Sequence, residues 1–239
     1  GWLRFGGGQE LWDELYAQFN VKPFAAGNTG LQAGGWFNKE INTVDDIKGI
    51  KMRYAGIGGE AMRRLGANVT MLPAAEILPA MQSGAIEAAE WVGPWNDYAF
   101  GLTQVGKYYY TPAFAEPGTG IEVFVNKDKF AELPEDLQEI FAVAAQANLE
   151  QTLADFTFHN IQSYQAVLAK GAEIRHFSDD VIAALATEVK AAVKEIADQN
   201  ELNGRIYASY MDFVKKAAPY GKEFEATGLL QRANVWAEA

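Results

Sequence analysis

Residues 50–91 decide the fold, and they read IKMRYAGIGGEAMRRLGANVTMLPAAEILPAMQSGAIEAAEW. Three of their segments have the pattern of strands, and the two segments between them have helical spacing. Strands are expected at 50–55, 67–73 and 85–91, and helices at 60–66 and 74–84. This alternation predicts an α/β unit with a parallel sheet, because each helix carries the chain back to the start of the next strand.

The segments before this unit predict one helix, one strand and a short capped helix. Residues 9–19 place Leu11, Leu15 and Phe19 on one helical stripe, and residues 21–27 form a short strand. A Thr that precedes acidic residues is typical of a helix N-terminus, so a short helix is expected between Thr43 and Gly49.

The segments after the unit are expected to be mainly helical. Residues 92–112 are aromatic and irregular, whereas the alternating residues 120–130 predict a strand. Pro134 and its acidic neighbours open a long helix that runs to about Lys170. The remaining segments are a strand at 173–177, a helix at 178–198 and a helical tail to Trp236 that is broken near Pro219.

The composition excludes several functional classes. The chain has 239 residues, 20 Lys plus Arg against 31 Asp plus Glu, and a formal net charge of −11. This acidic balance, without a cluster of Lys or Arg, argues against a nucleic-acid partner. The absence of cysteine excludes disulfides, thiol nucleophiles and thiolate metal sites. No stretch approaches the roughly 20 apolar residues that span a bilayer.

Arg53 is a candidate binding residue because it lies on a predicted strand of the sheet core. An unpaired guanidinium is costly in such a place, so Arg53 must meet solvent, a buried carboxylate or an anionic ligand. Its planar fork suits a carboxylate, which accepts two parallel hydrogen bonds from it. From the residue alone, a ligand contact and an exposed strand position are equally good interpretations.

Glu90 and Gln32 are candidate ligands of a cation. Glu90 and Trp91 end the third strand of the α/β unit, where ligands bind in open parallel sheets. Gln32 lies in a glycine-rich loop and offers an amide oxygen, and hard cations prefer oxygen ligands. The alternative is that Glu90 forms an ion pair and that Gln32 is a polar loop residue.

Two other features suggest enzyme chemistry only weakly. Gly56, Gly58 and Gly59 match a dinucleotide-binding pattern, but the preceding strand carries charged residues instead of the apolar run of a buried parallel strand. His159 and His176 have no partner at a metal-ligand spacing, so structural or surface roles are expected for both. No nucleophile motif is present, so no catalytic residue is assigned.

Several short motifs resemble a known family in both order and spacing. They are Gln32–Phe37 (QAGGWF), Asp46–Arg53 (DIKGIKMR), Leu65–Ala67 (LGA), Ala85–Trp91 (AIEAAEW) with Gly93–Pro94, Lys107–Tyr110 (KYYY) and Glu116–Gly118 (EPG). The chain resembles the periplasmic solute-binding proteins of TRAP transporters, the DctP-like family. It looks most similar to the branch that binds 2-oxo acids such as pyruvate together with a metal ion.

The resemblance implies a two-lobe α/β periplasmic-binding-protein fold with parallel or mixed sheets and a helical C-terminal region. The family's signal peptide and the first elements of its N-terminal lobe have no counterpart here, so that lobe is expected to be incomplete. The expected division is 1–30 for the remainder of lobe 1, 31–120 for lobe 2 with the site, 121–177 for the connection between the lobes and 178–239 for the helical region.

The resemblance also implies roles for individual residues. Arg53 matches the arginine that grips the ligand carboxylate. Gln32, Glu90 and the backbone carbonyl of Trp91 match the metal ligands, and a Na⁺ or Ca²⁺ ion would bridge protein and ligand. The site residues are therefore Gln32, Arg53, Glu90 and Trp91, with Trp36 and Trp95 expected as walls of the pocket.

The implied function is binding without catalysis. The expected protein is an exported periplasmic subunit that captures a small organic acid and delivers it to TRAP membrane permease subunits, with a homodimer as a further possibility. The alternatives are a relative that binds lactate, a dicarboxylate or a sugar acid, and a nucleotide-binding α/β enzyme.

Overall fold

A computed structural model of the chain describes residues 1–237, which form two compact units. One unit is Pro23–Val193, and the other joins Gly1–Lys22 to the chain from Lys194 onward. Helix α8 (Asp179–Ala197) crosses the boundary between the two units. The division into four segments that the resemblance implies remains a prediction.

The larger unit contains a six-stranded mixed sheet with the strand order β4-β3-β5-β2-β6-β8. Strands β3, β4 and β5 run parallel, β2 is antiparallel to both β5 and β6, and β6 is parallel to β8. The strand bounds are β2 Gly35–Phe37, β3 Lys51–Arg53, β4 Asn68–Thr70, β5 Ala88–Ala89, β6 Tyr108–Thr111 and β8 Glu173–His176. The predicted α/β unit with its parallel strands is confirmed.

The helices expected between these strands are also present. Helix α3 (Gly56–Arg64) joins β3 to β4, and α4 (Ala74–Gln82) joins β4 to β5. The short helix after Thr43 is the 3₁₀ helix Val44–Ile47, and Thr43 and Asp46 form a capping box at its start. Such a box satisfies backbone donors that the helix itself leaves free.

The sheet buries an apolar layer on each face, because alternate side chains of a strand point to opposite sides. Phe37 and Met52 belong to one layer, whereas Trp36 and Tyr109 belong to the other, and all four side chains are buried. Trp36 pairs with Tyr109 across β2 and β6, and their rings stack with centroids 4.3 Å apart.

Two segments differ from the expectation. Residues 92–112 are not irregular, since they contain α5 (Pro94–Ala99), the 3₁₀ helix Leu102–Gln104 and β6. Aromatic residues pack well on a half-buried pleated surface, which explains β6. The strand expected at 120–130 is β7 (Gly120–Asn126), and Asn126 then caps α6 (Lys127–Ala131) by accepting the Lys129 N–H at 3.0 Å.

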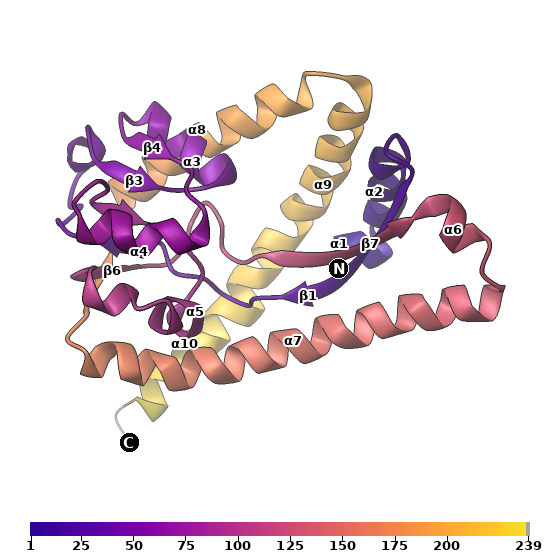
Figure 1. Cartoon of the computed structure of the whole chain (residues 1–239). Coiled ribbons are helices and arrows are strands. Elements are labelled where there is room, and N and C mark those ends of the chain that lie inside the picture. The colour runs from indigo at the N-terminus through magenta and orange to yellow at the C-terminus, as the bar shows by residue number, and fades with distance from the viewer. Residues whose placement is uncertain (238–239) are drawn as a thin grey trace. The chain divides into compact units, whose positions relative to one another are not determined.

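A second sheet pairs β1 (Val21–Asn28) with β7, and the two strands run side by side in Figure 1. The long helix expected after Pro134 is α7 (Glu135–Ala169), a continuous helix of 35 residues. Phe24 packs between Phe130 and Phe141, with ring centroids 5.2 and 5.0 Å away. Helix α5 lies against α7 near its other end (Figure 1).

The smaller unit is helical. Its helices are α1 (Trp2–Phe5), α2 (Gly8–Ala17), α9 (Glu201–Tyr220), a π-helical turn Gly221–Ala226 and α10 (Thr227–Trp236). Trp2 packs edge-on against Tyr210 and donates its indole N–H to Ser209 Oγ at 3.1 Å. The π-helical turn follows Pro219, where the missing N–H removes a helical hydrogen bond. Within residues 1–237, no helix is long and apolar enough to cross a membrane.

Candidate functional site

Arg53 and Glu90 form a buried ion pair at the ends of neighbouring parallel strands. Arg53 ends β3 and lies in register with Ala89 of β5, so Glu90 follows directly beyond it. The Arg53 Nη1 atom donates to the Glu90 carbonyl oxygen at 2.5 Å and to Glu90 Oε2 at 3.1 Å. Arg53 is 7% exposed and Glu90 is 2% exposed. Arg53 is therefore not an exposed strand residue.

Trp91 covers the other side of the guanidinium. The Arg53 Cζ atom lies 5.0 Å from the Trp91 ring centroid, which is the geometry of a cation–π contact. The same ring packs against Phe100 with centroids 5.1 Å apart. The Trp91 ring therefore packs against the guanidinium of Arg53 while the guanidinium bonds to Glu90.

Gln32 contributes an oriented amide to the site from the loop between β1 and β2. Its Nε2 atom donates to Thr29 Oγ1 at 2.9 Å and to Thr119 Oγ1 at 2.8 Å. Both amide protons are then used, and the Oε1 atom is buried without a hydrogen-bond partner. A buried polar oxygen without a partner is costly, so its presence indicates a position suited to a ligand.

Backbone contacts hold the Gln32 loop beside Trp91. The Ala33 N–H donates to the Val92 carbonyl at 2.9 Å, so the loop runs along the residue that follows Trp91. Gly35 has φ +118°, and a Cβ atom at this position would lie 2.8 Å from the Ala89 carbonyl oxygen. Only glycine allows this close approach, which explains the second glycine of the QAGGWF motif.

The site raises the pKa values of two of its carboxyl groups, Glu90 and Glu116. Burial, followed by the nearby Glu116 carboxylate, raises the pKa of Glu90 from 4.5 to about 8, although Arg53 opposes the shift. Burial also raises the pKa of Glu116. A cation beside Glu90 would stabilise its ionised form and lower this pKa.

The donor set fits a hard cation. It combines one carboxylate, one free amide oxygen and a main-chain carbonyl, which are the oxygen types that Na⁺ and Ca²⁺ accept. No group of three His, Cys, Asp or Glu residues with metal-binding geometry occurs in the described part of the chain. A cation here would therefore depend on amide and carbonyl oxygens as well as on Glu90.

Further buried polar atoms without a hydrogen-bond partner belong to the residues of this site. Besides Gln32 Oε1, the buried side-chain atoms without a hydrogen-bond partner in residues 1–237 are Arg53 Nε, Trp91 Nε1 and Asn96 Oδ1. Three of the four atoms belong to residues that the sequence singles out. Such a concentration favours a binding site over a structural ion pair.

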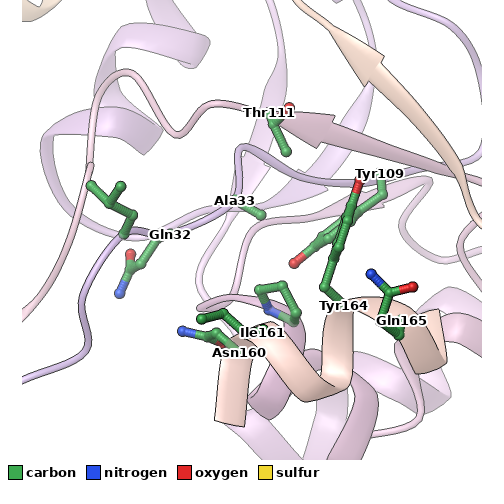
Figure 2. Close-up of a pocket in the computed structure, with 10 residues that line it drawn as sticks. Gln32, Ala33, Tyr109, Thr111, Asn160, Ile161, Tyr164 and Gln165 are labelled. Carbon is green, nitrogen blue, oxygen red and sulfur yellow. The ribbon is translucent and has the colours of Figure 1, made fainter. Parts of the chain in front are cut away.

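A cavity of about 320 Å³ lies on one side of Gln32. Figure 2 shows that Asn160, Ile161, Tyr164 and Gln165 reach it from α7, opposite the Gln32 loop. The complete lining is Leu31, Gln32, Ala33, Pro94, Tyr109, Thr111, Asn160, Ile161, Tyr164 and Gln165. Of the predicted site residues, only Gln32 lines this cavity.

The expectation that Trp36 walls the pocket is wrong. Trp36 is fully buried, stacks on Tyr109 and donates its indole N–H to Asp97 Oδ2 at 3.0 Å. It belongs to the core of the sheet. Trp95 stacks on His159 of α7 with ring centroids 4.3 Å apart, which also gives that histidine a structural role.

Two of the three glycines of the dinucleotide-like pattern pack inside the protein, whereas Gly56 is exposed and has a positive φ of +59°. Gly58 and Gly59 are buried at the start of α3, and a Cβ atom on Gly59 would lie 2.5 Å from the Tyr54 carbonyl oxygen. This close packing accounts for Gly58 and Gly59 without a nucleotide. His176 contacts Thr111 Oγ1 at 3.0 Å through its Nδ1 atom.

Four residues near the site were not assigned from the sequence. Thr29 and Thr119 orient Gln32, Glu116 adds charge, and Asp97 is a buried carboxylate behind Trp91. Thr29 and Thr119 are 90 residues apart in the chain, so no local pattern identifies them together. Glu116 belongs to the EPG motif, and Asp97 follows Gly93–Pro94 by three residues. Nothing in the spacing of either residue indicates that its carboxylate is buried.

The sequence and the fold both match known solute-binding proteins. Residues 3–200 match the family model of DctP, bacterial extracellular solute-binding protein, family 7. The chain is 41% identical over 216 residues to a monocarboxylate 2-oxoacid-binding periplasmic protein of Nostoc sp. (strain PCC 7120). That match covers 90% of this chain and 59% of the relative, so the chain spans less than two thirds of the length of this curated protein.

Two solved structures share the fold closely. A TRAP transporter solute-binding protein from Bordetella bronchiseptica superposes with a TM-score of 0.93 at 31% identity, covering 100% of this chain and 71% of its own. It is a mixed-occupancy dimer with an active site that holds copurified calcium and picolinate and a site that is apo. The solute-binding protein from Pseudoalteromonas atlantica, with bound sodium and pyruvate, superposes with a TM-score of 0.88 at 36% identity. This match covers 96% of this chain and 70% of the Pseudoalteromonas chain.

The family match covers most of the chain, and the solved relatives share its fold. The chain belongs to the DctP family, family 7 of the bacterial extracellular solute-binding proteins.

Proposed function

We propose that this chain is the solute-binding subunit of a TRAP transporter, which captures a small 2-oxo monocarboxylate of the pyruvate type together with Na⁺ or Ca²⁺. Two observations carry the proposal: the buried Arg53–Glu90 pair, and the buried, unpaired Gln32 Oε1 atom, whose loop is held to the residue after Trp91 by the bond from the Ala33 N–H to the Val92 carbonyl. An ion pair that served stability alone would not explain why the Gln32 amide oxygen is buried without a partner.

Three oxygens would hold the cation: Gln32 Oε1, the Glu90 carboxylate and the Trp91 carbonyl. The cation, when bound, supplies positive charge that a ligand's two neighbouring oxygens can share. Thr29 and Thr119 keep the Gln32 amide turned so that its oxygen is free. Glu90 provides the one negative charge of the set, so cation and carboxylate balance each other inside the protein.

Arg53 would bind the ligand carboxylate through its free edge. Its Nη1 atom is already engaged by Glu90, whereas Nε is buried without a partner. The Nε and Nη2 atoms form the side-on edge of a guanidinium, which meets a carboxylate through two parallel hydrogen bonds. The Glu90 contact and the Trp91 ring hold this edge in place.

The ligands of the two solved relatives support a chelating solute. Pyruvate and picolinate each carry a carboxylate beside a second donor atom, a keto oxygen in one and a ring nitrogen in the other. Such a molecule can offer both donors to one cation while its carboxylate also reaches an arginine. The 41% identity to a 2-oxoacid-binding protein points to the same solute class.

The transport role follows from the family. Its members are extracellular solute-binding proteins, and we place this chain in the periplasm, where it would deliver its solute to TRAP permease subunits. Two lobes that close around the solute would present it to the permease. Binding, and not catalysis, is the proposed activity, and no nucleic acid is an expected partner.

A homodimer is also proposed. Leu229, Leu230, Val235 and Trp236 of α10 are each more than 60% exposed. A second copy would cover this apolar surface, since exposed patches of this kind mark interaction sites. The Bordetella relative is a dimer. Sedimentation of the protein at micromolar concentration would distinguish a dimer from a monomer.

Metal-independent binding of a dicarboxylate, lactate or a sugar acid is the second candidate. It would keep Arg53 as the carboxylate contact but leave Glu90 without a cation. The free Gln32 Oε1 atom argues against it, because this buried oxygen would then stay without a partner. The buried glycines of α3 argue against the nucleotide-binding alternative.

The test is the melting temperature of the metal-stripped protein with pyruvate, with Ca²⁺ or Na⁺, and with both. A ligand at 100 times its Kd adds about 2.7 kcal/mol of stability. We expect the shift to require both components and to vanish in Glu90→Ala and Arg53→Ala, whereas Glu76→Ala, at an exposed position on α4, keeps it. A shift with dicarboxylates or sugar acids in the absence of metal would support the second candidate instead.

A further inference from the structure

Asp97 is a buried carboxylate whose two oxygens serve different partners. It lies on α5 and is 1% exposed. Its Oδ2 atom accepts the Trp36 indole N–H at 3.0 Å and the Tyr109 hydroxyl at 2.9 Å, both from the sheet core. Its Oδ1 atom accepts the backbone N–H of Val92 at 3.2 Å.

The Val92 N–H belongs to the same peptide group as the Trp91 carbonyl. The bond between these residues is trans, and the C=O and N–H of a trans peptide point in opposite directions. Asp97 therefore sets the direction of the Trp91 carbonyl by holding the other end of the peptide plane. No hydrogen bond to the Trp91 carbonyl oxygen is found among residues 1–237.

We propose that Asp97 is the positioning residue for the cation, acting through the Trp91–Val92 peptide. This inference rests on the proposed function, because the Trp91 carbonyl is one of the three oxygens assigned to the cation. A carboxylate that accepts a hydrogen bond from the Val92 N–H polarises the peptide, which makes the Trp91 carbonyl oxygen a stronger ligand for a cation. Groups behind a metal ligand commonly orient and tune it in this way.

A carboxylate is required because an amide cannot satisfy the same donors. Both Trp36 and Val92 present an N–H, which can only donate. Asn in place of Asp97 has one oxygen, so one of the two N–H groups would face an NH₂ group. The Oδ2 position meets two donors, Trp36 and Tyr109, and Oδ1 meets one, so the single oxygen stays with the two donors and the NH₂ group faces Val92. The Trp91–Val92 peptide then loses its anchor, and the Trp91 carbonyl loses its direction.

Tyr109→Phe is a matched control for Asp97→Asn. It removes one hydrogen bond to Asp97 Oδ2, keeps the aromatic ring that Tyr109 adds to the cavity lining, and leaves the contact between Oδ1 and the Val92 N–H intact. Both variants weaken the buried network, whereas only Asp97→Asn releases the peptide. The pair therefore separates a role in core stability from a role in positioning.

The experiment measures the Ca²⁺ affinity of each protein by calorimetry at saturating pyruvate, and its melting temperature without cation. We expect Asp97→Asn to bind Ca²⁺ about 10- to 100-fold more weakly, and Tyr109→Phe to keep the wild-type affinity although its melting temperature falls. Wild-type affinity in Asp97→Asn, or an equal loss in both variants, would overturn the inference. If the wild-type protein binds no cation with pyruvate, the proposed function itself fails.

A second measurement needs no variant and covers the case in which Asp97→Asn does not fold. Carbon-13 NMR of the wild-type protein can follow the Trp91 carbonyl while Ca²⁺ and pyruvate are added. We expect its resonance to shift while the hydrogen-bonded amide signal of Val92 stays in place. An unchanged Trp91 carbonyl resonance, or a Val92 amide that loses its hydrogen bond on binding, would contradict the role of Asp97.

Discussion

Arg53 contacts Glu90 twice through a single nitrogen, since Nη1 donates both to the backbone carbonyl and to the carboxylate of that residue. The remaining guanidinium edge is not used by Glu90. One buried pair can therefore serve a solute anion on the Arg53 side and a cation on the Glu90 side. Removal of either partner would leave a buried charge uncompensated, so the two halves of the proposed site depend on each other.

Cation binding should depend on pH because Glu90 must lose a proton to bind a cation. The pKa of Glu90 is about 8, so at lower pH a proton competes with the cation. We expect Ca²⁺ affinity with pyruvate to fall by about tenfold per pH unit below pH 8. Calorimetry between pH 6 and 8.5 tests this, and an affinity that is constant over this range would contradict it. Glu90→Gln should bind weakly and without this dependence.

The cation-free protein should lose stability as the pH rises. Folding raises the pKa of Glu90 from 4.5 to about 8, so the folded state binds the proton more tightly than the unfolded state. The favourable contribution is complete below pH 4.5 and is lost as the pH rises to about 8. Urea unfolding at several pH values should show this decline in wild type and a weaker decline in Glu90→Gln. Excess Ca²⁺ with pyruvate should reduce it.

Arg53→Lys should weaken solute binding although it conserves the charge. An ammonium group lacks the planar edge that meets a carboxylate through two hydrogen bonds. Hydrogen bonds to charged groups contribute about 1.5–3 kcal/mol, so pyruvate affinity should fall by roughly 10- to 150-fold. Lys51→Met, at the exposed start of the same strand, is the control and should bind normally. Equal affinity in wild type and Arg53→Lys would remove Arg53 from the site.

Thr119→Val should lower cation affinity although the substitution leaves all three proposed cation ligands in the sequence. The Thr119 hydroxyl accepts one of the two Gln32 amide protons, and its loss frees the amide to rotate away from the binding orientation. We expect a loss of several-fold or more in Ca²⁺ affinity, in line with other groups behind metal ligands. Thr157→Val is the control, because that exposed hydroxyl donates to the Leu153 carbonyl of its own helix, α7. A normal affinity in Thr119→Val would argue that Gln32 is not a cation ligand.

Gly35→Ala should destabilise the larger unit. Its φ of +118° is strained for alanine, and the added Cβ atom would lie 2.8 Å from the Ala89 carbonyl oxygen. Backbone strain of this kind costs about 1–3 kcal/mol. The added Cβ atom would also lie 3.1 Å from the Cα atom of Glu90, next to the proposed site. Gly228→Ala on α10 meets no atom within 4 Å and should be neutral or stabilising by up to about 1 kcal/mol. Chemical denaturation of both variants tests the contrast.

The sequence alone predicts most of the local structure of this protein. The apolar spacing and the glycine ends of residues 50–91 predict the order of β3, α3, β4, α4 and β5, because each signal lies within a few residues of the element it shapes. Strand β6 was missed, since the aromatic residues Tyr108–Tyr110 carry no clear alternation. Its existence depends on pairing with β2 and β8, which are distant in the chain.

The sequence also singles out Arg53, Glu90 and Gln32 by residue type and place, but it leaves their roles open. Only the tertiary structure decides that Arg53 pairs with Glu90, that two threonines hold the Gln32 amide, and that Asp97 lies behind the Trp91–Val92 peptide. These outcomes depend on burial and on contacts between segments up to about 90 residues apart. Burial sets the pKa of Glu90 and leaves Gln32 Oε1 unpaired, because desolvation acts on a side chain only after the distant segments have packed around it.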